Sequence, residues 1–181
     1  MSTDGLDPKN LKVIASADQI QKRIAELAKQ IGQDYRGKTL YAVGVLEDSF
    51  VFMADLVRAL DVPVVCQFLK PHQHAKAETT EIRYSPEVHV EGQHVLLLEG
   101  LVKSGITAEY LMHNMTGRGA QSVKLAAFLD KQSERRIALQ PDYFGFLVDE
   151  AYVVGYGLGA PDLGRNLPYL ASMQSSAGKG K

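Results

Sequence analysis

Apolar positions along this chain of 181 residues fall into helical and strand-like spacings. The first helix signal is Ser16 followed by Gln19, a spacing typical of a capping box. The apolar residues that follow recur on one helical face and are Ile20, Ile24, Leu27, Ala28 and Ile31. Gly37 comes after them as a stop signal. The pattern predicts an amphipathic helix between Ser16 and Gly37.

Apolar runs of strand length alternate with further helix-compatible segments. The predicted strands cover residues 39–45, 62–68, 94–99, 122–129, 143–148 and 152–156, and the later helices cover 50–60 and a segment from Ala108 onward. This alternation predicts an α/β fold with a parallel-dominated, doubly wound sheet flanked by helices. Ligands bind at the carboxyl ends of such strands, so the loops after Val45, Glu99 and Leu129 are candidate sites. The polar segment 70–86 is expected to form a long surface excursion.

Composition narrows the class of protein. The net charge of −1 gives no reason to expect a nucleic-acid or membrane-surface partner, and no apolar run reaches membrane-spanning length. The only cysteine, Cys66, fits a reducing cytoplasm, and its apolar neighbours predict a buried, inert thiol. The N-terminus has no apolar stretch typical of a secretory signal. We expect one domain over residues 1–175 and a disordered polar tail at 176–181.

The segment from His94 to Thr107 carries the strongest chemical signal. An apolar strand stops at the acidic Glu99, and a short glycine-containing loop then leads into a helix. Such a turn presents several backbone N–H groups with two hydroxyls beside them, which suits a phosphate monoester. The predicted phosphate-binding residues are Lys103, Ser104, Gly105, Ile106 and Thr107.

This segment resembles the phosphoribosyl-pyrophosphate (PRPP) loop of the hypoxanthine phosphoribosyltransferases, which reads Val-Glu-Asp-Ile-Val-Asp-Thr-Gly-x-Thr. Further segments resemble the family in the right order over residues 14–171, and they include 43–46, 49–58, 122–126, 129–131, 141–146, 153–158 and 165–169. The chain is therefore identified as a member of that family. The resemblance implies a type I phosphoribosyltransferase core, a small hood built from both chain ends, and homodimers or homotetramers.

The resemblance also implies roles for single residues. Glu99 matches an acid that binds the ribose hydroxyls, and Arg165 matches an arginine that reaches pyrophosphate. On the purine side, Lys131 matches the lysine that donates to the exocyclic oxygen, Tyr152 the stacking aromatic residue, and Val153 a backbone contact to the base. Active members attack C1 of PRPP with a purine nitrogen, helped by magnesium and by an aspartate that accepts a proton from the base.

Several positions depart from the family pattern. Gly100 and Lys103 replace the two aspartates of the PRPP loop, so Lys103 occupies the position of the general base. Gly159 stands where an acid helps to bind magnesium, and residues 70–76 replace the Ser-Ser-Tyr-Gly closing loop. All of these changes affect the handling of pyrophosphate and metal. Lys103 is read either as a solvated loop residue or as a phosphate contact.

The pyrophosphate loop itself is altered as well. Glu47 and Asp48 replace the Lys-Gly of the family pattern. These acids either oppose pyrophosphate binding or cap the helix that begins near Phe50. We also consider a salt bridge from Lys103 to one of them, which would fill the vacated pyrophosphate space. Separately, Arg165 is expected to be idle, because its family counterpart reaches pyrophosphate.

Three functions remain open at this point. The leading one is a hypoxanthine phosphoribosyltransferase-like protein that binds a purine nucleoside monophosphate, or another phosphorylated small molecule, with weak or absent transfer. The second is an active purine salvage enzyme that converts hypoxanthine or guanine and PRPP to IMP or GMP and pyrophosphate. The third is a non-catalytic partner subunit of an active homologue. No cofactor is expected, except magnesium in the second case.

Overall fold

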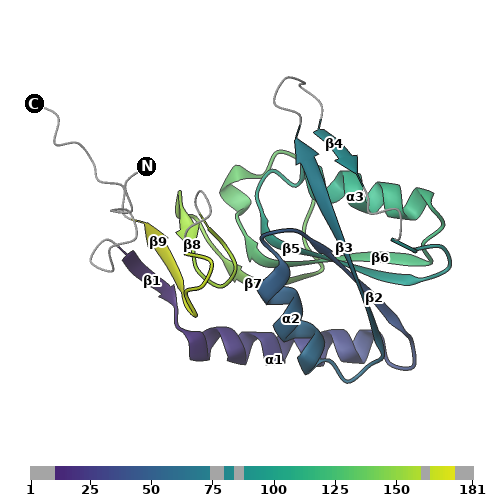
Figure 1. Ribbon diagram of the computed structural model, residues 1–181, viewed down its shortest axis with the longest axis horizontal. Coiled ribbons are helices and arrows are strands. Elements are labelled where there is room, and N and C mark those ends of the chain that lie inside the picture. Colours follow the sequence, from purple (N-terminus) through teal and green to yellow (C-terminus); the bar gives the residue numbers. More distant parts are fainter. Residues whose placement is uncertain (1–10, 74–79, 84–87, 160–163, 174–181) are drawn as a thin grey trace, which may run out of the picture.

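The main sheet of this computed structural model, which describes residues 11–73, 80–83, 88–159 and 164–173, has six strands in the order β4-β3-β2-β5-β6-β7 (Figure 1). Their bounds are β2 (Leu40–Val45), β3 (Val64–Gln73), β4 (Thr80–Arg83), β5 (His94–Val102), β6 (Ser122–Asp130) and β7 (Tyr143–Leu147). All neighbouring strands are parallel except β3 and β4. The predicted parallel-dominated sheet is confirmed.

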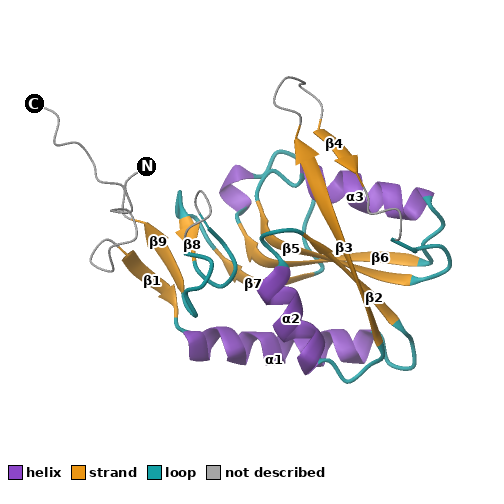
Figure 2. Cartoon of the chain, viewed as in Figure 1, coloured by secondary structure: helices purple, strands orange, loops and turns teal. Residues whose placement is uncertain are grey.

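Helices cover both faces of this sheet (Figure 2). The helices α1 (Ala17–Asp34) and α2 (Phe50–Ala59) pack on one face, and α3 (Ile106–Gly117) packs on the other. Alternate β5 residues point to the two sides: Leu96 joins the core under α1 and α2, whereas Leu97 joins the core under α3. Burial on both faces explains the continuous apolar run of β5.

The predicted first helix is confirmed in detail. The backbone N–H of Gln19 donates to Ser16 Oγ over 3.3 Å, and the backbone N–H of Ser16 donates to Gln19 Oε1 over 2.8 Å. These bonds complete the capping box and satisfy two donors at the helix start. All five apolar residues of the predicted face are buried. The helix ends at Asp34, three residues before Gly37, which has a positive φ of 75°.

A small second sheet forms the hood. It has the strand order β1-β9-β8, with β1 (Leu11–Ala15), β8 (Val153–Val154) and β9 (Leu170–Met173) all antiparallel. One strand comes from the beginning of the chain and two from its end, so the hood expected from the family resemblance is confirmed. It lies beside the β7 edge of the main sheet (Figure 1).

In the polar segment 70–86, β3 extends to Gln73 and pairs with β4, and residues 74–79 and 84–87 lie outside the described ranges, so the expected surface excursion stays a prediction. Two expectations for the strands were wrong. The strand β5 continues past Glu99 to Val102. Cys66 is exposed on β3, because that strand lies near the sheet edge and its principal neighbours are strands.

The short helix η3 (Gln132–Glu134) follows β6. Within the described ranges, no helix has the length and apolar character needed to cross a membrane.

Candidate functional site

The strands β2, β5 and β6 run parallel, with β5 between the other two. Their carboxyl ends therefore lie next to one another at the same end of the main sheet. Two of the cavities at this end of the sheet are bordered by Lys103. The smaller, about 180 Å³, has among its lining residues Asp48, Lys103, Lys131, Tyr152, Val153 and Gly159. The larger, about 590 Å³, is lined by Lys103, Ser104, Ser133, Glu134, Arg135 and Arg136. Lys103 borders both cavities and therefore lies between them.

The predicted phosphate loop lies between the end of β5 and the start of α3. Gly105 occupies the N-cap position with a φ of 85°, in the left-handed region that favours glycine. The N–H of Ile106 donates to Ser104 Oγ over 3.3 Å, so that hydroxyl turns back onto the loop. Lys103 and Thr107 are exposed. The loop opens toward the larger cavity, and its phosphate-binding role stays a prediction.

The predicted purine-side residues lie together around the smaller cavity. Lys131 is only 4% exposed, and its Nζ donates to the backbone oxygen of Glu150 over 2.9 Å. The same Nζ lies 2.6 Å from Glu134 Oε1. Tyr152 is exposed at the rim, and Val153 begins β8. Residues that are far apart in the sequence therefore form one pocket wall.

Glu99 on β5 is a buried acid close to the site. Burial raises its pKa to about 7, while the nearby Arg135 opposes that rise. Its Oε1 atom has no hydrogen-bond partner among the described residues. An unpartnered buried carboxylate oxygen is costly, so a hydroxyl-bearing ligand would compensate this group.

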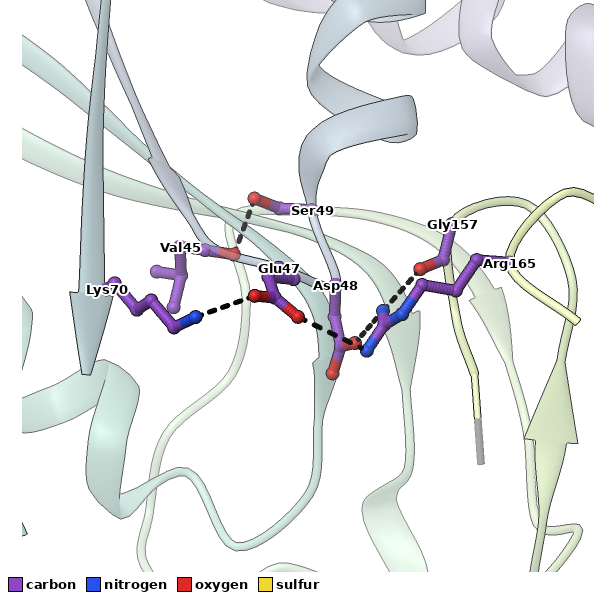
Figure 3. Close-up of polar contacts among 7 residues, drawn as sticks. All are labelled: Val45, Glu47, Asp48, Ser49, Lys70, Gly157 and Arg165. Atoms are coloured by element: carbon purple, nitrogen blue, oxygen red, sulfur yellow. Dashed lines mark hydrogen bonds and ion pairs between the residues drawn. The ribbon is translucent and has the colours of Figure 1, made fainter. Parts of the chain in front are cut away.

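The altered pyrophosphate loop is held by two cations, as Figure 3 shows. Glu47 Oε1 lies 2.6 Å from Lys70 Nζ, and Asp48 Oδ1 lies 2.5 Å from Arg165 Nη1. The Arg165 guanidinium also donates to the backbone oxygen of Gly157 over 2.6 Å. Hydrogen bonding to Lys70 lowers the pKa of Glu47. The loop is therefore tied both to β3 and to the segment that follows β8.

These contacts overturn three expectations. Within the described part of the chain, Lys103 forms no ion pair with Glu47 or Asp48, which pair with other cations. Arg165 is not idle, because it binds Asp48. The two acids do not cap α2 either: its N-cap is Ser49, with no side-chain cap bond, and Ser49 Oγ instead donates to Val45 O over 2.7 Å. Instead of capping the helix, the two acids pair with Lys70 and Arg165.

Sequence reasoning missed two residues of the site, Asp130 and Arg135. Asp130 is 1% exposed at the end of β6 and forms an ion pair with Arg135. Arg135 Nη1 is buried with no hydrogen-bond partner in the described residues, and it would lie 3.2 Å from a Cβ at Gly105. The guanidinium therefore packs directly against the phosphate loop. An acid at the end of a strand followed by two arginines was the available signal.

Magnesium, which the resemblance implies for an active enzyme, finds few ligands here. Mg²⁺ prefers carboxylate oxygens. Glu47 and Asp48 are paired with cations, Gly100 and Gly159 carry no carboxylate, and Glu99 is buried. In the described ranges, no three His, Cys, Asp or Glu residues are grouped so as to hold a metal. The protein's own residues do not fit a dedicated magnesium site.

Comparisons with known proteins place this geometry in a family. Residues 12–160 match the model of the phosphoribosyl transferase domain. The chain is 34% identical to the hypoxanthine-guanine phosphoribosyltransferase of Bacillus subtilis, over 90% of this chain and 93% of that protein. It is 35% identical to the bifunctional protein TilS/HprT of Listeria innocua, but it spans only 26% of that protein's length.

Solved structures agree with the sequence comparison. A hypoxanthine-guanine phosphoribosyltransferase from Bacillus anthracis superposes with a TM-score of 0.84 at 31% identity, covering 91% of this chain and 97% of the other. A hypoxanthine phosphoribosyltransferase from Staphylococcus aureus superposes with a TM-score of 0.87 at 28% identity, covering 96% and 98%. The fold, the order of the matched segments and these relatives agree, and the chain belongs to the hypoxanthine phosphoribosyltransferase family, with its type I phosphoribosyltransferase fold.

Proposed function

We propose that this protein binds a purine nucleoside 5′-monophosphate, such as IMP or GMP, and forms it slowly from the base and PRPP. The observation that carries the proposal is the pair of cavities that share Lys103 in their linings. One is bordered by the phosphate loop, and the other by Lys131, Tyr152 and Val153. A nucleotide placed across them would have its phosphate at the loop and its base at Lys131.

Each element of the ligand then has a suitable partner. The phosphate receives the N–H groups of the helix start, the hydroxyls of Ser104 and Thr107, and the ammonium group of Lys103. The ribose hydroxyls donate to the unpartnered oxygen of Glu99. The base stacks on Tyr152 and accepts a hydrogen bond from Lys131. We expect a homodimer or homotetramer, in line with the family.

The identity of the relatives supports an active purine salvage enzyme better than a protein that has lost transfer. In that reaction N9 of the base attacks C1 of PRPP, the bond from C1 to pyrophosphate breaks, and the base loses a proton. The altered loops argue for a low rate. Asp48 with Arg165, and Glu47 with Lys70, hold carboxylates where the family pattern has Lys-Gly for pyrophosphate.

Binding and turnover can be tested on the same preparation. Calorimetry with IMP, GMP and PRPP should show that both nucleotides bind more tightly than PRPP. Assays with hypoxanthine or guanine, PRPP and magnesium should give nucleotide at well below ~1 s⁻¹, the low end of ordinary enzymes. Failure of IMP and GMP to bind would refute the nucleotide site. Turnover at ordinary rates would refute the slow step, and binding without any turnover would favour a binding protein or a partner subunit.

A further inference from the structure

Glu134 lies at the junction of the two cavities. It ends the short helix η3, and its Oε1 atom is 2.6 Å from Lys131 Nζ. Lys131 borders the smaller cavity, whereas Glu134 borders the larger one together with Lys103 and Ser104. A carboxylate therefore stands beside the lysine expected to bind the base, close to the position from which the family aspartate is missing.

The setting of this pair differs from an ordinary surface ion pair. Exposed pairs three residues apart are common on helices and contribute little stability. Arg23 and Glu26 form such a pair, with both side chains substantially exposed. In the pair with Glu134, the side chain of Lys131 is 5% exposed and also donates to Glu150 O, whereas that of Glu134 is 48% exposed. The lysine is fixed by the protein, and the carboxylate faces the cavity.

The two groups match one edge of a 6-oxopurine. Such a base carries an acceptor, O6, next to a donor, N7–H. Lys131 is a donor and Glu134 is an acceptor, and they are themselves within hydrogen-bond distance. The pair can therefore bind O6 and N7–H together. Adenine presents an amino donor in place of O6, which would face the lysine unfavourably.

We propose that Glu134 accepts the N7 proton of the purine during phosphoribosyl transfer, in place of the aspartate that Lys103 replaces. In this step the N9 lone pair forms the bond to C1 of PRPP, and the electrons of the breaking C1–O bond leave with pyrophosphate. The N7–H bond then breaks, and its proton passes to the Glu134 carboxylate. The proposal rests on the proposed function, because it requires that the protein performs this transfer.

The charges around Glu134 suit this role. The hydrogen bond from Lys131 lowers the pKa of Glu134, and the charges of Lys103 and Arg136 act in the same direction. The carboxylate is therefore ionised at neutral pH and is ready to accept a proton. The positive charge of Lys103 therefore favours the ionised form of Glu134, which is the proposed proton acceptor.

The test compares Glu134→Gln with the wild-type protein in the hypoxanthine reaction. We expect kcat to fall by about 10²-fold or more, as for loss of a positioned proton acceptor, with IMP affinity changed little. In the wild type, kcat should fall at acidic pH as the carboxylate protonates, and this acidic limb should disappear in Glu134→Gln. Glu134→Asp should restore part of the rate. Glu26→Gln, which removes an ion pair of the same spacing, should behave like the wild type.

Other outcomes would overturn the proposal in distinguishable ways. A higher KM for hypoxanthine with an unchanged kcat and pH profile would mean that Glu134 only holds Lys131 in position. Wild-type protein that binds IMP but forms none would exclude Glu134 as a proton acceptor and leave the nucleotide site intact. Lack of IMP binding by the wild type would refute the proposed function itself.

Discussion

Gly100 on β5 lies directly against the backbone carbonyl of Asp48: a Cβ atom at position 100 would be 2.3 Å from that oxygen. Real Cβ atoms do not approach a carbonyl oxygen so closely. Glycine therefore permits the loop that contains Asp48 to close onto β5. The aspartate that the family has at this position could not coexist with the observed loop. The observed loop position therefore depends on the absence of a side chain at position 100.

Replacing Gly100 should consequently destabilise the protein. Gly100→Ala should lower the free energy of unfolding by about 1–3 kcal/mol, the usual cost of overpacking, and Gly100→Asp should lower it further. Thermal denaturation measures the effect. Gly117→Ala on α3 is the matched control, because nothing lies within 4 Å of a Cβ there. Equal melting temperatures for the two alanine variants would contradict the close approach.

The acids of the closed loop should repel pyrophosphate. Opposed or like unit charges about 5 Å apart interact by roughly 3 kcal/mol at an effective dielectric near 20, and exposure reduces this value. We expect Glu47→Gln with Asp48→Asn to raise pyrophosphate affinity by about tenfold, measured by calorimetry at low salt. The gain should shrink as salt is added.

A control for this double variant removes two carboxylates elsewhere. Asp18 and Glu26 lie exposed on α1, so Asp18→Asn with Glu26→Gln produces the same change in net charge. That variant should leave pyrophosphate affinity unchanged. If both double variants gain affinity equally, the effect belongs to the overall charge and not to the loop.

Local signals explain which parts of the fold the sequence predicted. The first helix was predicted well because its capping box and its apolar face involve residues within a few positions of one another. The strand β1 was not predicted, because it is stabilised by pairing with β9 at the other end of the chain. The apolar run around Cys66 indicated a strand but could not indicate whether a helix would cover it.

Charge pairing in the site was equally hard to foresee. Asp48 and Arg165 are 117 residues apart, and they meet only because the loop closes over Gly100. The sequence identified both residues and their opposite charges, but it assigned the acids to Lys103. To predict which cation pairs with each acid, the positions of the loops must be known. Asp130 and Arg135 are only five residues apart, and their local signal, an acid at a strand end followed by arginines, was overlooked.

The phosphate loop should bind an anion through its shape as well as its charge. Gly105→Ala places a methyl group at a φ of 85° and against Arg135, so it should strain the loop. We expect IMP affinity to fall by tenfold or more in this variant. Lys103→Gln should cause a smaller loss and a weaker salt dependence. Gly37→Ala, also at positive φ but with open space around it, controls for strain alone.

Glu99 should make stability depend on pH. Its pKa is raised from 4.5 to about 7 by burial, so the folded state holds the proton more tightly than the unfolded chain. This contribution is fully present below pH 4.5 and is lost as the pH rises through about 7. The shift corresponds to roughly 3 kcal/mol. Denaturant titrations between pH 4.5 and 8 should show stability declining by a value of this order.

Glu99→Gln should remove that slope, because the amide does not ionise. At pH 8 the variant should be more stable than the wild type, yet it should bind IMP more weakly if the carboxylate accepts the ribose hydroxyls. A variant that is more stable but binds IMP more weakly would show that the Glu99 carboxylate serves ligand binding and does not stabilise the fold. A variant that lost both stability and affinity at pH 8 would instead mean that Glu99 is a structural acid, stabilised where it lies by Arg135.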